Sequence, residues 1–213
     1  MKKYQSEDSH REIGYDLVIE EIPEGSRVLD LGCGDGVLLE RLKDIKNVAG
    51  AGVEISEQGV GMCVEKGLYC YQGDIDEGLS DYRANSFDYV ILNQTLQNTK
   101  RPDYVLREIL RICRSCIISF PNFGYYATRL HLLFRGKMPV SPLLPYEWYE
   151  TPNIHLLTIR DFRSLCNASG YPVRRESNFS ISRNGRSHVI LRNPNLYAQY
   201  GFFVLDGEGF TGD

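Results

Sequence analysis

Val28-Leu-Asp-Leu-Gly-Cys-Gly-Asp-Gly36 decides how this chain folds, because it joins a run of apolar residues to a glycine-rich turn. The apolar run predicts a buried strand, and the pattern at residues 37–42 predicts a helix directly after the turn. Gly32, Gly34 and Gly36 allow the backbone to turn tightly and to approach a ligand without an intervening side chain. The free N–H groups of the first helical turn would face that ligand. The stretch therefore predicts a ligand-binding turn between a strand and a helix.

The spacing of the glycines bears on the kind of ligand. A dinucleotide-binding turn has the pattern G-x-G-x-x-G, whereas here Gly36 comes one residue early and Val37 stands where the third glycine would be. This difference disfavours a pyrophosphate ligand, and with it a nicotinamide-dependent oxidoreductase. Asp30 and Asp35 favour instead a ligand that carries positive charge and meets the turn through its carboxylate or amine.

Two further acids follow the next predicted strands. Glu54 ends the strand at 49–54, close to the offset at which an acid binds ribose hydroxyls in doubly wound sheets. Asp74 follows the strand at 68–71 and is suited to accept a hydrogen bond from an adenine amino group, with Ile75 packed on the ring. Because the carboxyl ends of parallel strands meet at one edge of a sheet, we expect one nucleoside-binding site there.

With these residues at the ends of three successive strands, the chain resembles the class I S-adenosylmethionine-dependent methyltransferase fold. The resemblance implies an α/β, Rossmann-like fold with a seven-stranded, mostly parallel sheet and helices on both faces. It also implies S-adenosylmethionine as the cofactor. The residues expected at this cofactor are Asp30, Gly32, Cys33, Gly34, Glu54, Ile55, Gly73, Asp74, Ile75, Asn93 and Gln94.

Four further segments narrow the resemblance. They are Phe87-Asp-Tyr-Val-Ile-Leu-Asn-Gln-Thr-Leu-Gln97, Ser119-Phe-Pro-Asn-Phe-Gly124, Gly136-Lys-Met-Pro139 and Trp148-Tyr-Glu-Thr-Pro-Asn-Ile-His155. Together they are similar to the methionine biosynthesis protein MetW family, over about residues 10 to 205. The resemblance implies a soluble bacterial-type protein of methionine synthesis that associates with homoserine O-acetyltransferase. It leaves open whether the protein methylates a small-molecule acceptor or acts as a non-catalytic partner whose cofactor occupancy reports methionine status.

Length and composition agree with one globular domain over residues 1–213. Hydrophobic residues make up 42% of the chain and charged residues 24%, which is typical of a protein with a substantial core. The net charge of −4 argues against a nucleic-acid-binding surface, which needs a basic face. No apolar run is long enough to span a membrane, and no secretion signal follows Met1. We therefore expect a cytoplasmic protein that contacts neither nucleic acid nor membrane.

The periodicity of apolar residues predicts alternating strands and helices, and hence a parallel sheet with right-handed crossovers. Strands are expected near 27–31, 49–54, 68–71, 87–92 and 116–120. Helices are expected near 11–21, 36–45, 56–66, 102–113, 125–135 and 158–168. The closing strands are expected at 173–180 and 201–205, with 187–191 as a competing strand.

Residues 124–157, hereafter the inserted segment, depart from this alternation. An amphipathic helix is expected first, and then prolines at 139, 142, 145 and 152 prevent regular structure. Aromatic residues crowd into Tyr146-Glu-Trp-Tyr149. The segment follows the fifth strand, so it is expected over the carboxyl ends of the strands. It could serve as a lid that shapes a small-molecule pocket or as a docking surface for a partner, and the sequence favours neither.

Catalytic signatures are sparse. No [DN]-P-P-[YF] pattern follows the fourth strand, where Asn93-Gln-Thr-Leu-Gln97 stands instead. The sequence therefore lacks the pattern that usually supports methylation of the amine of a nucleobase. Methyl transfer needs a general base only when the nucleophile holds a proton that is hard to lose. His155 is the one histidine to consider for that role, against the alternative that it is structural.

The six cysteines are best explained as small apolar residues of a reducing compartment. Cys113-x-x-Cys116 has the spacing of a metal or redox pair, but no second such pair completes a zinc site. The pair also lies where a predicted helix ends, whereas a redox pair gains its low thiol pKa at a helix start. Cys33 fits the glycine turn as a small side chain. No metal site is expected.

Overall fold

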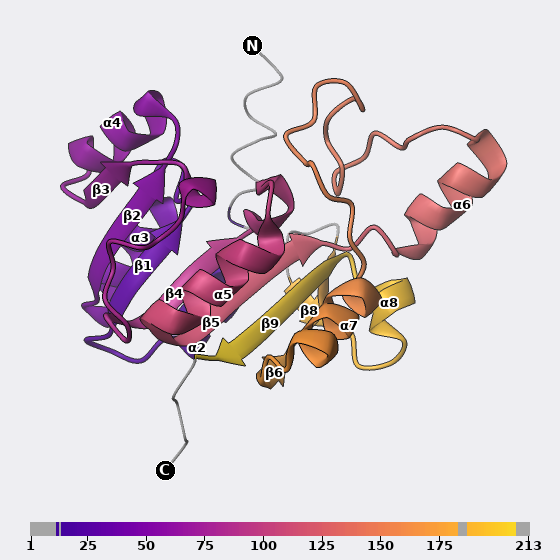
Figure 1. Ribbon diagram of the computed structural model, residues 1–213. Coiled ribbons are helices and arrows are strands. Elements are labelled where there is room, and N and C mark those ends of the chain that lie inside the picture. Colours follow the sequence, from indigo (N-terminus) through magenta and orange to yellow (C-terminus); the bar gives the residue numbers. More distant parts are fainter. Residues whose placement is uncertain (1–11, 13, 183–186, 208–213) are drawn as a thin grey trace.

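Five parallel strands form the first half of one sheet, as expected from the sequence (Figure 1). The computed structural model describes residues 12, 14–182 and 187–207. The parallel strands are β1 (Arg27–Leu31), β2 (Ala49–Glu54), β3 (Tyr69–Gln72), β4 (Phe87–Asn93) and β5 (Cys113–Pro121). The helices of this half are α2 (Tyr15–Glu21), α3 (Val37–Lys46), α4 (Glu57–Glu65) and α5 (Pro102–Ile112). The helix predicted over 11–21 is described from Tyr15 onward, and residues 11 and 13 lie outside the described residues.

The second half of the sheet is antiparallel. It consists of β6 (Val173–Glu176), β7 (Phe179–Ile181), β8 (Ser187–Val189) and β9 (Tyr200–Asp206). β9 pairs with β5 on one side and with β6 and β7 on the other, and the order across the sheet is β3-β2-β1-β4-β5-β9-β7-β8. The described residues thus form nine strands where seven were predicted. The strand expected over 173–180 is broken between Glu176 and Phe179, and the competing segment at 187–191 pairs with β7 as β8.

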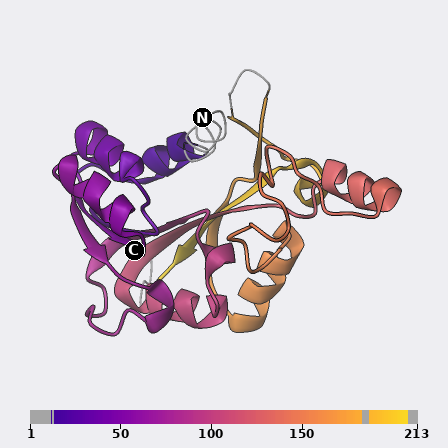
Figure 2. The same cartoon turned by 90° about the horizontal axis from the view of Figure 1, so that it is seen from above.

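Two hydrophobic cores, one on each face of the sheet, hold the helices. α2 and α3 pack on one face through Val18, Ile22 and Leu42, while α5 and α7 (Ile159–Ser169) pack on the other through residues such as Leu106 and Phe162. Figure 2 shows the sheet between these two layers of helices. None of the described helices is long and apolar enough to cross a membrane.

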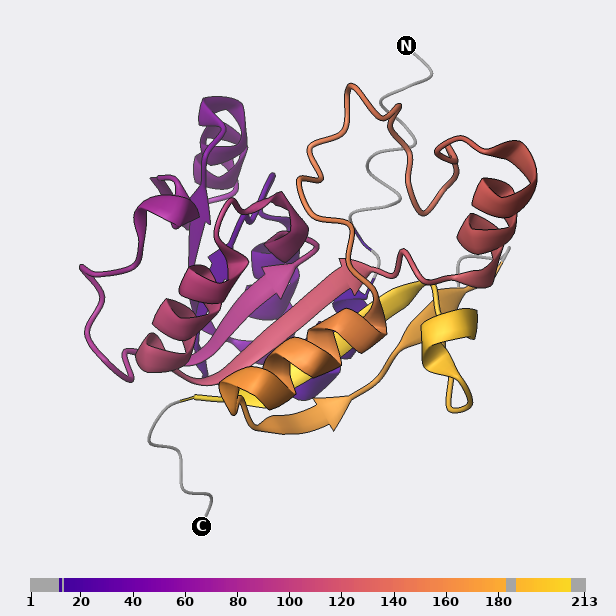
Figure 3. The same ribbon diagram turned by 45° about the vertical axis from the view of Figure 1, so that its right-hand side comes forward.

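The inserted segment leaves the layered part of the fold. It contains α6 (Tyr126–Arg135) and an irregular stretch that continues to α7, and Figure 3 shows the stretch arching over the ends of β4 and β5 while α6 extends away from the sheet. The carbonyl oxygen of Gln97 accepts hydrogen bonds from the N–H groups of Ile154 (2.9 Å) and His155 (3.0 Å), which fixes the end of the stretch. α7 begins with a capping box formed by Thr158 and Asp161.

Helix α4 approaches the glycine turn unusually closely. A Cβ atom on Gly59 would lie 2.8 Å from the backbone oxygen of Gly34 and 2.8 Å from Cγ of Glu54, so only glycine fits there. Gly61, two residues later, has nothing within 4 Å of its Cβ position. The two glycines of α4 therefore differ: Gly59 is required by packing and Gly61 is not.

This difference predicts opposite effects of the same substitution. Gly61→Ala should raise the free energy of unfolding by about 0.5–1 kcal/mol, because alanine has the higher helix propensity. Gly59→Ala should lower it by about 1–3 kcal/mol, because the added methyl group forces α4 away from the turn. Urea unfolding of both variants measures this, and two changes of the same sign would contradict the described packing.

Candidate functional site

The glycine turn at the end of β1 has a backbone that glycine alone adopts easily. Gly32, Gly34 and Gly36 have φ angles of 76°, 60° and 78°. A Cβ atom on Gly32 would also lie 2.6 Å from Cγ2 of Thr95, so this position lacks room for a side chain. The carbonyl oxygen of Val53 accepts the N–H group of Gly32 at 2.8 Å, which ties the turn to β2. The turn is thus a rigid backbone surface at the carboxyl edge of the sheet.

The carboxylate of Glu54 lies directly against this turn. Its Oε2 atom accepts the N–H group of Gly34 at 2.8 Å, and its Oε1 atom accepts the N–H group of Ser56 at 2.9 Å. An ionised carboxylate has about four acceptor positions, so about two remain for a ligand. Glu54 therefore both positions the turn and keeps the acceptor capacity that ribose hydroxyls require.

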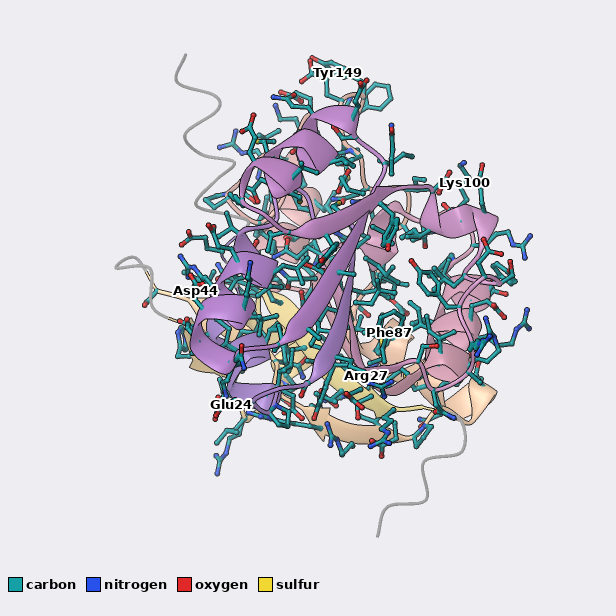
Figure 4. The ribbon with its side chains drawn as sticks, turned by 90° about the vertical axis from the view of Figure 1, so that its left-hand side faces the viewer. Glu24, Arg27, Asp44, Phe87, Lys100 and Tyr149 are labelled. Atoms are coloured by element: carbon teal, nitrogen blue, oxygen red, sulfur yellow. The ribbon has the colours of Figure 1, made fainter. Side chains whose placement is uncertain are left out.

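Asp74 and its neighbours form the next part of the site. Asp74 Oδ1 accepts the N–H group of Asp76 at 2.9 Å and caps the short 3-10 helix η1 (Ile75–Glu77), while its Oδ2 atom lies 3.5 Å from Nζ of Lys100. The backbone N–H group of Lys100 donates to Asp76 at 2.9 Å. Figure 4 shows Lys100 at the same end of the molecule as Tyr149, far from Arg27 and Phe87 at the opposite end.

The third part of the site consists of amide side chains that follow β4. Asn93 Oδ1 accepts the hydroxyl of Ser119, and Gln94 has a φ of 58°, which is unusual for a residue with a side chain. Within the described residues, three buried amide atoms lack a hydrogen-bond partner: Gln94 Nε2, Gln97 Oε1 and Asn98 Oδ1. Buried polar atoms are normally paired, so a water molecule or a polar ligand beside them would satisfy these atoms.

These three parts surround a cavity of about 560 Å³. A volume of this size suits a nucleoside-sized ligand. Its lining includes ten of the residues predicted from the sequence: Gly32, Cys33, Gly34, Glu54, Ile55, Gly73, Asp74, Ile75, Asn93 and Gln94. The structure thus brings together the residues that were expected at a cofactor.

Two predicted residues lie elsewhere. His155 lines a separate, smaller cavity of about 320 Å³ beside α7, so the structure does not bring it to the predicted cofactor residues. Asp30 is only 3% exposed and is absent from the lining of the large cavity. Burial, together with the negative charge of Glu54, raises the pKa of the Asp30 carboxyl to about 7.

The sequence reasoning missed other residues of the lining. Tyr15 comes from the helix before β1, Tyr200 from the last strand, and Thr95 and Lys100 from the chain after β4. The inserted segment contributes Pro142, Leu143, Pro145, Tyr146, Pro152 and Asn153. Thr95, Pro152 and Asn153 lie in segments that the sequence analysis singled out, but they were not assigned to the site. The only signal for the last group was the expectation that the inserted segment lies over the strand ends.

Comparison with known proteins finds similar sequences. The family model described as methionine biosynthesis protein MetW matches residues 12–205. The bifunctional methionine biosynthesis protein MetXA/MetW of Rhodopirellula baltica is 35% identical over 200 residues. That match covers 90% of this chain and 32% of the relative, so the chain spans about a third of the relative's length.

Solved structures give the same fold. A chain in the complex of the Haloferax volcanii Trm112 methyltransferase activator with a methyltransferase has a TM-score of 0.69 at 19% identity, covering 97% of this chain and 93% of that one. An S-adenosylmethionine-dependent methyltransferase from Mesorhizobium loti has a TM-score of 0.65 at 16% identity, covering 91% and 97%. The predicted class I methyltransferase fold is confirmed.

The buried carboxyl of Asp30 predicts a pH dependence of stability. Its folded pKa of about 7 exceeds the ordinary value of 3.8, so between about pH 4 and 7 the unfolded chain loses this proton while the folded chain keeps it. The free energy of unfolding should therefore fall as pH rises through this window, by on the order of 4 kcal/mol at most.

Asp30→Asn should remove this slope, because an amide does not titrate. Urea unfolding at several pH values measures it, with Asp44→Asn, an exposed acid on α3, as the control that keeps the slope. Parallel curves for wild type and Asp30→Asn would show that Asp30 does not hold the proton.

Proposed function

The chain belongs to the methionine biosynthesis protein MetW family, and on this premise we propose that it binds S-adenosylmethionine and acts as a partner of homoserine O-acetyltransferase. The observation that carries the proposal is the carboxylate of Glu54, which is hydrogen-bonded to the glycine turn at the wall of a nucleoside-sized cavity. The proposed site of action is the cytoplasm.

The charge of the cavity fits this cofactor. Its described lining contains the carboxylates of Glu54, Asp74 and Asp76 and one cationic side chain, Lys100. Acids in a partly enclosed site attract positive charge, and S-adenosylmethionine carries a sulfonium and an amine. The excess of acids therefore supports a cationic ligand over a phosphate-bearing one.

Each part of the cofactor has a suited position in the chain. The backbone at Gly32 and Gly34 suits the amino-acid portion, because no side chain blocks the approach. The free acceptor positions of Glu54 suit the ribose hydroxyls, and Asp74 and Ile75 suit the adenine. When bound, the cofactor supplies an electrophilic methyl group on a good leaving group. The residues of the chain bind it, orient it and exclude water.

The inserted segment has two functions in this proposal, because its two sides differ. Leu143 is buried and lines the cavity with Tyr146, which suits a lid over the cofactor. Other apolar residues of the segment are exposed: Leu133 (73%), Phe134 (77%), Trp148 (70%) and Tyr149 (66%). Exposed aromatic side chains of this kind are typical of binding hot spots.

We infer that homoserine O-acetyltransferase occupies this exposed side. The supporting observation is the relative from Rhodopirellula baltica, whose name joins MetXA to MetW in one polypeptide. Covalent connection gives two modules a high effective concentration, which benefits proteins that act together. In this chain, the exposed apolar residues of the inserted segment would provide the contact between the two proteins.

The alternative function is a catalytically active small-molecule methyltransferase that is independent of this partner. The unpaired amide atoms of Gln94, Gln97 and Asn98 favour it, because they could bind an acceptor beside the cofactor. A methylated acceptor whose formation Glu54→Ala abolishes would favour this alternative. Altered acetyltransferase behaviour without any methylated product would favour the partner role.

Calorimetric titration with S-adenosylmethionine, S-adenosylhomocysteine and NAD tests the cofactor. We expect the two nucleosides to bind and NAD not to bind. Glu54→Ala should weaken S-adenosylmethionine binding about 10- to 100-fold, because hydrogen bonds to a charged group contribute about 1.5–3 kcal/mol each.

Glu65→Ala, which removes an exposed acid at the end of α4, is the matched control and should bind like wild type. Glu54→Gln, which keeps one acceptor oxygen, should lie between wild type and Glu54→Ala. Unchanged affinity in a folded Glu54→Ala variant, or tighter binding of NAD than of the nucleosides, would rule out the proposal.

Binding to purified homoserine O-acetyltransferase tests the partner. The double variant Leu133→Ser, Phe134→Ser should weaken the complex at least about tenfold in an immobilised-partner assay, because exposed apolar anchors are lost. Val64→Ser removes another exposed apolar side chain, from α4, and should leave the complex intact. Equal affinity of all three proteins would show that the partner does not bind at α6.

A further inference from the structure

Three cysteines from separate elements meet behind the glycine turn. Cys33 belongs to the turn itself, Cys63 to α4 and Cys70 to β3. The Sγ atom of Cys33 lies 3.8 Å from Sγ of Cys63 and 3.6 Å from Sγ of Cys70, and all three sulfurs lie within 4.8 Å of one another. Cys33 and Cys63 are buried, and Cys70 is partly exposed.

The surrounding backbone leaves room for these sulfurs. A Cβ atom on Gly52 of β2 would overlap Sγ of Cys33, and one on Gly36 would lie 2.8 Å from Sγ of Cys63. Glycine at both positions therefore gives the thiols their space. Gly36 is also required by its φ of 78°, whereas Gly52 has no positive φ and does not line the cofactor cavity.

We propose that Cys33, Cys63 and Cys70 form a binding site for a thiophilic divalent metal ion of the Zn²⁺ or Cd²⁺ class. The distances carry the proposal. A zinc–sulfur bond of about 2.3 Å with tetrahedral angles separates two sulfur ligands by about 3.8 Å. Two of the three sulfur–sulfur separations, 3.6 and 3.8 Å, match this value, and the Cys63–Cys70 separation lies within 4.8 Å, so the thiols need to move by no more than about 1 Å to bind one ion.

Binding exchanges protons for the metal. Each of the three thiols loses one proton, three metal–sulfur bonds form, and the divalent ion with three thiolates has a net charge of −1. The fourth tetrahedral position is left to a water molecule. The ammonium of Lys66, which donates to the carbonyl oxygen of Asp35 at 2.8 Å, stabilises the thiolate of Cys63, whereas the carboxyl of Asp30 opposes charge on Cys33.

A disulfide switch explains the cluster less well. Burial raises the pKa of the Cys63 thiol to about 11 and that of Cys33 further still. Thiols with raised pKa are poor nucleophiles in disulfide exchange, and a metal ion must displace the same protons, so its affinity should rise with pH. A disulfide would also engage two of the three sulfurs and leave the convergence of the third without a reason.

Metal titration of the reduced, chelator-treated full-length protein tests the proposal. With Cd²⁺ we expect one ion per chain, a thiolate-to-metal charge-transfer absorption in the ultraviolet, and release of about three protons per ion. Cys70→Ser alters the most exposed of the three and should weaken Cd²⁺ binding at least tenfold. Cys166→Ser, a thiol of α7 on the opposite face of the sheet, is the control and should bind like wild type.

X-ray absorption spectroscopy of the Zn²⁺-loaded wild-type protein provides a test that needs no variant. Three sulfur neighbours at about 2.3 Å are expected. A shell of only oxygen and nitrogen, or equal loss of Cd²⁺ binding in Cys70→Ser and Cys166→Ser, would overturn the proposal. Since this test involves no nucleoside, its failure would leave the cofactor proposal standing.

Discussion

The carboxylate of Glu54 is the contact on which the candidate site depends. It receives N–H groups from Gly34 in the first turn and from Ser56 at the start of α4, so one side chain joins two loops. The parallel register of β1 and β2, which aligns Leu31 with Val53, brings those loops within reach. α4 then packs against the turn, which is feasible because Gly59 lacks a side chain. Without this carboxylate, the partly buried N–H group of Gly34 would lose its acceptor, at a cost of about 1–3 kcal/mol, whereas the exposed N–H group of Ser56 could donate to water.

The same packing buries the side chains next to the turn, which makes an uncompensated charge on them unfavourable. The pKa of the Asp30 carboxyl rises to about 7 because it is buried beside Glu54, and the thiols of Cys33 and Cys63 are held in their neutral forms. Charge is expensive in such surroundings unless an opposite charge accompanies it. A cationic cofactor next to the turn would provide this compensation for Glu54. A divalent cation bound by the cysteines would balance two of the three thiolate charges, and Lys66 lies near enough to favour the third.

Local sequence was sufficient to predict the parts of the site that lie at strand ends. The glycine turn, Glu54 and Asp74 each follow a recognisable strand, and the alternation of strands and helices brings the three together. Residues that arrive through tertiary packing had no such signal, and Tyr200, from the last strand, is an example. The cluster of thiols was not predicted, because Cys33, Cys63 and Cys70 are far apart in the chain and match no metal-binding spacing. The break between β6 and β7 likewise depends on pairing with β9.

The two-sided character of the inserted segment has a thermodynamic consequence. Leu143 and Tyr146 contact the cavity, whereas Trp148 and Tyr149, a few residues on, face solvent. Because a single short stretch of backbone carries both surfaces, ordering one of them restricts the other. Linkage then requires reciprocity: the factor by which an attached protein changes affinity for a small ligand equals the factor by which that ligand changes affinity for the protein. The concentration of the small ligand would thus change the extent of complex formation, and complex formation would change the affinity for the ligand.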